Sequence, residues 1–213
     1  MRENPQIVLT AMGDGLAGAW NRWCGDLPGV EVWRRSILDC ACDAVVSPAN
    51  SFGFMDGGID GIYLDHFGRG VQDRLRAAIL TRHDGELLVG QAEIVPSGDE
   101  AIPWLIAAPT MRVPMALRES VAPYLAARAV LLLWKNGTNP ATGRLVREDI
   151  RTIAFPGLGT GVGRIGPQTC ARQVRQAIED VLHRPAQLPR SWAEASERHQ
   201  LLYTDRPRNL QRD

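Results

Sequence analysis

The order of apolar and polar residues along the chain predicts short buried strands that alternate with amphipathic helices. Six short apolar runs fit strands: residues 7–11, 30–34, 43–46, 91–95, 104–108 and 152–155. Apolar residues spaced three and four apart predict helices over residues 15–24, 59–67, 71–80, 116–134 and 169–183. This alternation predicts an α/β fold, a three-layer α/β/α sandwich around a central mixed, mostly parallel sheet.

The sequence predicts one large domain followed by a short C-terminal extension. We expect Gly68 and Gly70 to separate two helices, and residues 136–143 to form a surface loop. A chain of 213 residues suits one well-buried core, so residues 1–183 are expected to form a single domain. Prolines interrupt the pattern after residue 183, and we expect residues 184–213 to be a partly docked or mobile C-terminal extension with a short helix over 192–202.

Charge and composition favour an ordinary globular protein that does not bind large charged partners through its overall charge. Lys and Arg number 24, as do Asp and Glu, so the formal net charge is zero and neither nucleic acid nor a membrane is expected as a partner. The sequence shows no secretory signal pattern and no apolar run of membrane-spanning length. We therefore expect a cytoplasmic monomer.

The metal-ligating residue types are scattered. The four cysteines include one close pair, Cys40 and Cys42, without a second pair or a histidine nearby, and the four histidines share no metal-binding spacing. We expect structural thiols in a reducing compartment, no metal and no cofactor.

Two glycine-rich loops stand out from this background. Residues 47–58 and residues 156–166 each follow a predicted strand and lead into a predicted helix. The start of a helix presents unpaired backbone N–H groups and the positive end of the helix dipole, which suits an anion such as phosphate. Two such loops can clamp a diphosphate between them.

The two loops resemble the ligand loops of the macro domain, a family that binds ADP-ribose and includes ADP-ribosylhydrolases. The first motif is Asn50 followed by Gly57-Gly58-Ile59-Asp60, and the second is Gly159-Thr160-Gly161-Val162. Each motif alone is weak, but the pair, each set between strand and helix, is more specific. The resemblance covers most of residues 7–183 and leaves the extension unexplained.

The resemblance implies a set of site residues. It implies that ADP-ribose contacts Ser47, Ala49, Gly57, Gly58, Ile59, Gly159, Thr160, Gly161, Val162, Gly163 and Arg164. It implies catalytic roles for Asn50 and Asp60, which would position the distal ribose and a water. Asp56 is a candidate second carboxylate, because it lies four residues before Asp60 and one of the two acids could be held protonated.

Each candidate also has a plainer interpretation. The Asn50 side chain can form an Asx turn that ends the strand, and an acid such as Asp60 in a first helical turn can simply offset the helix dipole. Asp56 can be a solvated loop residue, and the glycines can serve turns alone. Arg164, like Arg112 after another predicted strand, can pair with phosphate or lie on the surface.

The sequence departs from the family pattern at three places. Arg35-Ser36-Ile37 stands where the family has Gly-Asp-Ile, so adenine recognition by an aspartate would have to come from elsewhere, such as Asp14 or Asp39. Met55 and Asp56 interrupt the glycine run of the first loop. Gly163-Arg164-Ile165 occupies the region where the family carries an aromatic residue near the distal ribose.

These features lead to three hypotheses for function. The first is a mono-ADP-ribosylhydrolase that removes ADP-ribose from modified protein side chains, with esters of acidic residues as the substrate. The second is a module that binds ADP-ribose without turning it over. The third is a phosphatase acting on ADP-ribose 1''-phosphate, which depends on Asn50 more than on Asp60. The expected partner in each case is ADP-ribose or an ADP-ribosylated protein.

Overall fold

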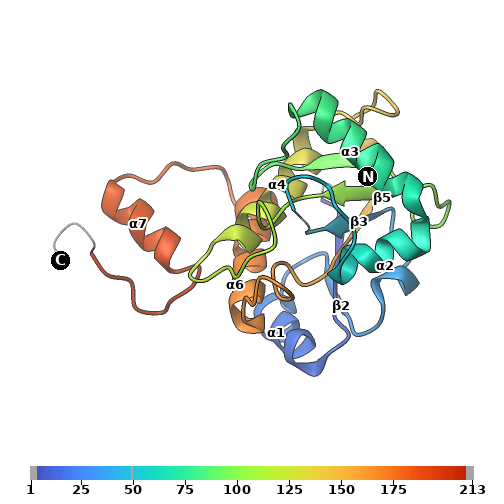
Figure 1. Cartoon of the computed structure of the whole chain (residues 1–213). Helices are drawn as coiled ribbons and strands as arrows, with labels where there is room; N and C mark the ends of the chain where they lie inside the picture. Colours follow the sequence, from blue (N-terminus) through green and yellow to red (C-terminus); the bar gives the residue numbers. More distant parts are fainter. Residues whose placement is uncertain (1–3, 49, 210–213) are drawn as a thin grey trace.

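A computed structural model describes residues 4–48 and 50–209 of the chain and shows a six-stranded sheet (Figure 1). The strands are β1 (Gln6–Thr10), β2 (Val30–Trp33), β3 (Ala44–Ser47), β4 (Glu93–Pro96), β5 (Trp104–Ala107) and β6 (Thr152–Phe155). Their order is β2-β1-β6-β3-β5-β4, and every pair is parallel except β4 with β5.

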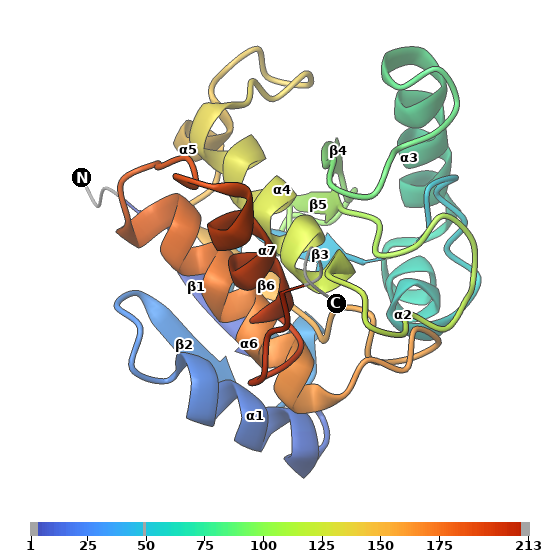
Figure 2. The same cartoon turned by 90° about the vertical axis from the view of Figure 1, so that its left-hand side faces the viewer.

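Helices cover both faces of this sheet. The α-helices are α1 (Asp14–Cys24), α2 (Gly58–Phe67), α3 (Arg69–Arg82), α4 (Ala122–Asn136), α5 (Val146–Asp149), α6 (Pro167–Ile178) and α7 (Trp192–Gln200). A 3-10 turn spans Ile37–Asp39, and a π-helical turn spans Glu179–His183. Helices α1, α4 and α6 pack on one face and α2 and α3 on the other, which confirms the predicted α/β/α sandwich (Figures 1 and 2).

Alternate strand residues supply the two halves of the core. On β1, Ile7 and Leu9 join the cluster under α1, α4 and α6, whereas Val8 joins the cluster under α2 and α3. On β3, Val46 and Val45 divide in the same way. Successive side chains of a strand point to opposite faces, so strands covered on both faces read as continuous apolar runs.

The predicted start of the longest helix is wrong. The apolar pattern predicted a helix from residue 116, but α4 begins at Ala122, with Pro123 in its first turn. The Leu117 N–H instead donates to the Gly163 carbonyl at 2.8 Å, which ties this segment to a distant loop. A proline is tolerated where a helix begins, because the first N–H groups have no partner inside the helix.

One smaller expectation also needs correction, and one short helix was not predicted. The predicted break at Gly68 and Gly70 occurs at Gly68 alone, where φ is +76°, and Gly70 lies inside α3. The predicted surface loop at residues 136–143 is followed by α5, a helix of four residues that the sequence pattern did not indicate.

The C-terminal extension contains the predicted short helix. Ser191 caps α7 by accepting a hydrogen bond from the Glu194 N–H at 3.1 Å. Figure 1 shows α7 standing away from the sheet. The turn that follows α7 contacts α6. There the Arg172 guanidinium donates to the Leu201 carbonyl at 3.2 Å and pairs with Asp205. Of the helices in the described part of the chain, none combines the length and apolar character needed to cross a bilayer.

Candidate functional site

The two glycine loops emerge side by side. β3 and β6 are neighbouring parallel strands, so the first glycine loop (residues 47–58) and the second glycine loop (residues 156–166) leave the same edge of the sheet. Figures 1 and 2 both show the loop that precedes α6 lying next to α2. In open parallel sheets this edge, at the carboxyl ends of the strands, is where ligands bind.

Three helices begin at this edge with glycine at the N-cap. Gly13, Gly57 and Gly166 precede α1, α2 and α6, which follow β1, β3 and β6, and none of the three makes a side-chain cap hydrogen bond. Gly58, the first residue of α2, has φ of +59°, a conformation that strains residues with a side chain. The first-turn N–H groups thus lack the side-chain acceptor that usually satisfies them, and an anion can take its place.

The Asn50 side chain holds the first glycine loop in shape. Its Oδ1 accepts hydrogen bonds from the Phe52 and Phe54 N–H groups at 3.1 and 3.3 Å, and its Nδ2 donates to the Phe54 carbonyl at 2.8 Å. These are the local bonds of an Asx-type turn. The amide is therefore engaged within its own loop.

Side chains from α3 brace the same loop. The Gln72 Oε1 accepts from the Met55 N–H at 2.8 Å. The Arg76 guanidinium donates to the Phe52 carbonyl at 2.9 Å and lies 4.2 Å from the centre of the Phe54 ring. Neither Gln72 nor Arg76 was predicted as a site residue, because glutamine and arginine on a helix surface belong to no recognisable motif.

Asp60 is the buried ionisable group of the site. It is 5% exposed, and its Oδ1 accepts a hydrogen bond from the Ser47 hydroxyl at 2.5 Å. Burial raises the pKa of Asp60 to about 7, and the bond from Ser47 partly offsets that rise. One turn along α2, the Tyr63 hydroxyl donates to the Val46 carbonyl at 3.1 Å. A carboxyl with this pKa exchanges protons near neutral pH.

The second carboxylate lies in a different environment. Asp56 is exposed, and it is not among the groups that shift the pKa of Asp60. The raised pKa of Asp60 thus comes from burial rather than from a pair of acids. Ala49, predicted to contact the ligand, lies outside the described residues.

Backbone contacts hold the second glycine loop. The Arg164 N–H donates to the Gly161 carbonyl and the Ile165 N–H donates to the Gly159 carbonyl, both at 3.0 Å. At Gly163 an added Cβ would lie 2.5 Å from the Gly159 carbonyl oxygen and 2.9 Å from Leu117 Cδ1, so only glycine fits there. At Gly161 an added Cβ would meet nothing within 4 Å.

The other residues predicted to contact the ligand differ in how exposed their side chains are. Ile59 is half-buried and packs on the core under α2 and α3. The Ser47 hydroxyl is engaged with Asp60, and Ser47 is fully buried. Val162 is 60% exposed beside Gly161, and Thr160 is half-buried, with its hydroxyl next to Gly157.

Ser36 stands where the resemblance led us to expect an aspartate that binds adenine, and it has a structural role. The Ser36 hydroxyl accepts from the Leu38 N–H at 3.3 Å and caps the 3-10 turn. Asp14, one of the substitutes suggested from sequence, pairs with Arg34 at the surface. The nearby Trp33 indole N–H is buried and has no hydrogen-bond partner within residues 4–48 and 50–209.

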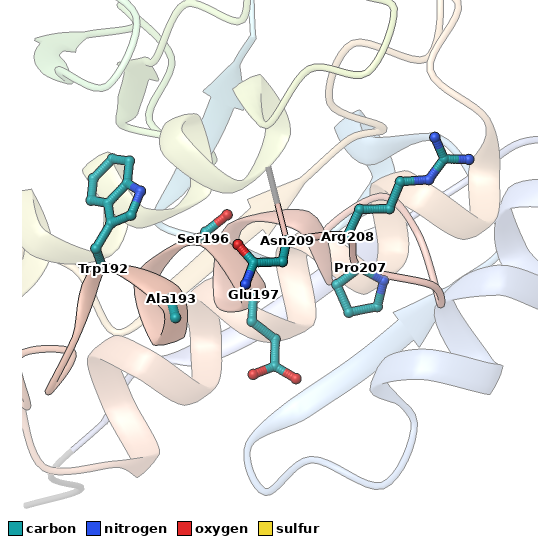
Figure 3. Close-up of a pocket in the computed structure, with 7 residues that line it drawn as sticks. All are labelled: Trp192, Ala193, Ser196, Glu197, Pro207, Arg208 and Asn209. Atoms are coloured by element: carbon teal, nitrogen blue, oxygen red, sulfur yellow. The ribbon is translucent and has the colours of Figure 1, made fainter. Parts of the chain in front are cut away.

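Two hollows involve the C-terminal extension. The larger, of about 980 Å³, lies between residues 116–120, residues 163–166 of the second glycine loop and residues 200–208 of the extension. The smaller, of about 230 Å³, lies between α7 and residues 207–209, with Trp192 at one end and Arg208 at the other (Figure 3). The lining of the smaller hollow includes no residue of either glycine loop, whereas residues 163–166 of the second glycine loop line the larger one.

The described residues contain no cluster of three or more His, Cys, Asp or Glu side chains that could hold a metal ion. All four cysteines are buried and free. Burial raises the pKa of Cys24 and of Cys170 to about 12, so these two thiols stay protonated at neutral pH. They act as small core residues.

Comparison with known proteins identifies relatives of this architecture. An uncharacterised protein of Aquifex aeolicus is 29% identical over 149 residues, which cover 70% of this chain and 80% of the relative. The macrodomain of Mycobacterium tuberculosis DarG superposes with a TM-score of 0.53 at 20% identity, over 68% of this chain and 86% of that one. A variant of the Oceanobacillus iheyensis macrodomain, solved with ADPR, gives 0.55 at 15% identity, over 83% of this chain and 77% of that one.

The match extends from structure to sequence. The sequence profile of the family described as Macro domain matches residues 46–174, which is more than half of the chain. The matched region starts within β3, just before the first glycine loop, and ends within α6, just after the second. Both loops and the sheet edge between them therefore lie in the matched region, and the chain belongs to the macro domain family.

Proposed function

We propose that this protein binds ADP-ribose between its two glycine loops and hydrolyses the bond that joins ADP-ribose to a protein side chain, with an ester of an acidic residue as the substrate. The observation that carries the proposal is Asp60, a buried carboxyl with a pKa of about 7, set in the first turn of the helix that follows the first glycine loop. A proton acceptor is most effective when its pKa lies near the working pH.

Binding rests on the glycine-capped helices. The free N–H groups at the starts of α2 and α6 would hold the diphosphate, together with the exposed backbone around Gly161. The DarG and Oceanobacillus structures show the same fold, and one Oceanobacillus structure contains ADPR. Oceanobacillus variants replace an asparagine, a glycine and an aspartate whose spacing is that of Asn50, Gly57 and Asp60.

Asp60 would act on a water beside the distal ribose. The water oxygen forms the new bond to the sugar, its proton passes to the Asp60 carboxylate, and the amino-acid side chain leaves as a carboxylate. Ser47 is a positioning residue in this scheme, because its hydrogen bond at 2.5 Å fixes the carboxyl and lowers its pKa. Ile59 and Val162 would line the path of the ligand, and Asn50 would keep the first loop in its binding shape.

Two observations favour a second candidate, a binding module without turnover. The Asn50 amide makes its hydrogen bonds within the loop, so it has little capacity left for orienting a substrate. A carboxyl as buried as Asp60 can also serve mainly to join α2 to β3 through Ser47. In that case ligand binding would remain and hydrolysis would be absent.

Single-turnover release of ADP-ribose from glutamate-linked, serine-linked and arginine-linked substrates tests the proposal. We expect the glutamate ester to be cleaved by the natural protein and Asp60→Asn to slow that step by about 10²-fold, the scale of losing a positioned base. ADP-ribose affinity, measured by calorimetry on the same preparations, should change far less, because backbone groups hold the diphosphate.

The control is Asp56→Asn, which removes the exposed carboxylate and should leave the rate within about twofold. Normal turnover by Asp60→Asn would refute the role of Asp60. No turnover by the natural protein on any of the three linkages would favour the binding module. We further propose that the protein acts as a cytoplasmic monomer, with residues 184–213 as an extension of a single macro domain.

A further inference from the structure

The larger hollow beside the second glycine loop has a strongly basic lining. Its walls carry Arg118, Arg164, Arg206 and Arg208, against a single carboxylate, Glu119, so three positive charges are unbalanced. The chain as a whole has no net charge. This concentration therefore contrasts with the rest of the molecule.

A further feature of the hollow is how its arginines are partnered. Some guanidinium groups elsewhere pair with acids, as Arg112 does with Glu86 at 2.7 Å and Arg175 with Glu179 at 2.9 Å, and others, such as Arg74 and Arg76, donate to backbone carbonyls. In the described part of the chain, none of the four arginines of the hollow forms an ion pair. Unpaired guanidinium groups gathered in one concavity leave their charge available to an anionic ligand.

The backbone holds these arginines in place. Gln200, which is 5% exposed, accepts from the Arg208 N–H and donates to the Arg208 carbonyl, both at 2.8 Å. Arg164 has φ of +56° and Glu119 has φ of +49°, a conformation rare for residues other than glycine and one that persists only when surrounding structure imposes it. The backbone that carries these side chains is thus fixed at several points of the lining.

We propose that this basic hollow binds an acidic segment of the protein that carries the ADP-ribose. The inference rests on the proposed function for its location, because residues 163–166 line the hollow and belong to the loop that would hold the distal part of the ligand. The peptide on either side of the modified residue would therefore lie over this surface. Glutamates and aspartates beside the modified residue would pair with the guanidinium groups, which match carboxylates in a bidentate geometry.

A peptide fits these observations better than a nucleic acid strand does. A strand is bound by cations that follow its backbone along a groove, together with aromatic side chains on which bases stack. Here the four arginines line a single hollow, and Tyr203, the aromatic residue of its lining, already packs edge-on against His199, with 5.6 Å between the ring centres.

The test uses the full-length protein and a fluorescent peptide of alternating glutamate and glycine, with anisotropy as the readout. We expect the peptide to bind, and its glutamine counterpart to bind at least about tenfold more weakly, because only charge is removed. The double variant Arg118→Gln with Arg206→Gln should bind the acidic peptide roughly threefold to tenfold more weakly, the scale of losing two partly exposed ion pairs.

The matched control removes two arginines outside the hollow, Arg69→Gln with Arg190→Gln, and should bind like the natural protein. Equal binding of the glutamate and glutamine peptides would overturn the inference, as would equal binding by the two double variants. Tighter binding of an oligothymidylate of the same charge than of the acidic peptide would assign the hollow to nucleic acid and also overturn it.

ADP-ribose affinity and turnover, measured on the same proteins, separate the two proposals. If the protein binds the acidic peptide but shows no hydrolytic activity, the proposed role of the hollow would be supported and the hydrolase mechanism refuted. If hydrolysis is intact but peptide binding depends neither on the glutamates of the peptide nor on Arg118 and Arg206, the proposed role of the hollow alone would be overturned.

Discussion

The two glycine loops leave neighbouring strands and reach the same edge of the sheet, but different forces hold them. Side chains brace the first: Asn50 bonds within it, and Gln72 and Arg76 reach it from α3. The second is fixed by backbone hydrogen bonds and by Leu117, which packs where Gly163 has no side chain. The first loop thus lies beside an ionisable side chain, Asp60, whereas the second offers the ligand a surface formed by its backbone.

This difference implies different responses to substitution. A change in the second loop should act through bulk or charge in the ligand path, because its backbone forms the surface. A change in the first loop should act through the bracing bonds or through ionisation of Asp60.

The largest effect is expected at the open glycine of the second loop. Gly161→Glu should weaken ADP-ribose binding by at least about 10³-fold, because a negative charge enters the proposed path of the diphosphate without a partner. The fold should remain, since nothing lies within 4 Å of a Cβ at Gly161. Calorimetry with Gly161→Ala as the control measures the effect, and retained binding by a folded Gly161→Glu protein would place the ligand elsewhere.

The next effect concerns the buried acid of the first loop. The pKa of Asp60 is raised from 3.8 to about 7 in the folded protein, so its ionisation opposes folding. Stability from this group is complete below pH 4, falls as the pH rises from about 4 to about 7, and is level above that range. Asp60→Asn removes this dependence.

We therefore expect Asp60→Asn to gain stability relative to the natural protein as the pH is raised. Between pH 5 and pH 8 the gain should be roughly 2–3 kcal/mol in the free energy of unfolding, from the difference between the two pKa values. Urea unfolding at both pH values measures it. A gain that does not depend on pH would show that burial does not raise the pKa of this carboxyl.

A closely packed glycine of the second loop should give a similar or smaller effect. Gly163→Ala forces a Cβ to within 2.5 Å of the Gly159 carbonyl oxygen, so the loop must shift. We expect a loss of about 1–3 kcal/mol in stability and a parallel loss of ADP-ribose affinity. Gly161→Ala, in open space two residues earlier, should stay within about 0.5 kcal/mol in thermal unfolding. Equal stability of the two variants would contradict the packing argument.

The smallest effect is expected at the bracing amide of the first loop. Asn50→Ala removes three hydrogen bonds within the loop, which together are worth about 1–2 kcal/mol. Affinity and the single-turnover rate should therefore fall together, each about fivefold to tenfold. A large loss of rate at unchanged affinity would mean that Asn50 touches the reacting bond instead of shaping the loop.

Periodicity was sufficient to predict most of the fold. The strand β6 (Thr152–Phe155) was predicted at its observed bounds and the other five within two residues, because buried strands are unbroken apolar runs between turn residues. The start of α4 was not predictable in this way. Residues 116–121 continue the helical pattern, but Leu117 is held by Gly163, a contact between residues 46 positions apart that no local pattern encodes.

The site was only partly predictable. Glycine motifs between strand and helix located both loops, because two such motifs each set between a strand and a helix are more specific than either alone. The bond from Ser47 to Asp60 and the bracing by Gln72 and Arg76 depend on side-chain directions in the folded chain. The basic hollow was missed because Arg118, Arg164 and Arg206 are far apart in sequence, and each alone reads as a surface residue.

The most direct test of the account is the pH dependence of single-turnover hydrolysis of the glutamate-linked substrate by the natural protein and by Ser47→Ala, corrected for the rate without protein. If Asp60 accepts the proton of the attacking water, the rate of the natural protein should rise through a pH of about 7 and then level. Ser47→Ala removes the hydrogen bond that lowers this pKa, so its rising limb should lie at higher pH. A flat profile, or the same limb in both proteins, would contradict the catalytic role of Asp60.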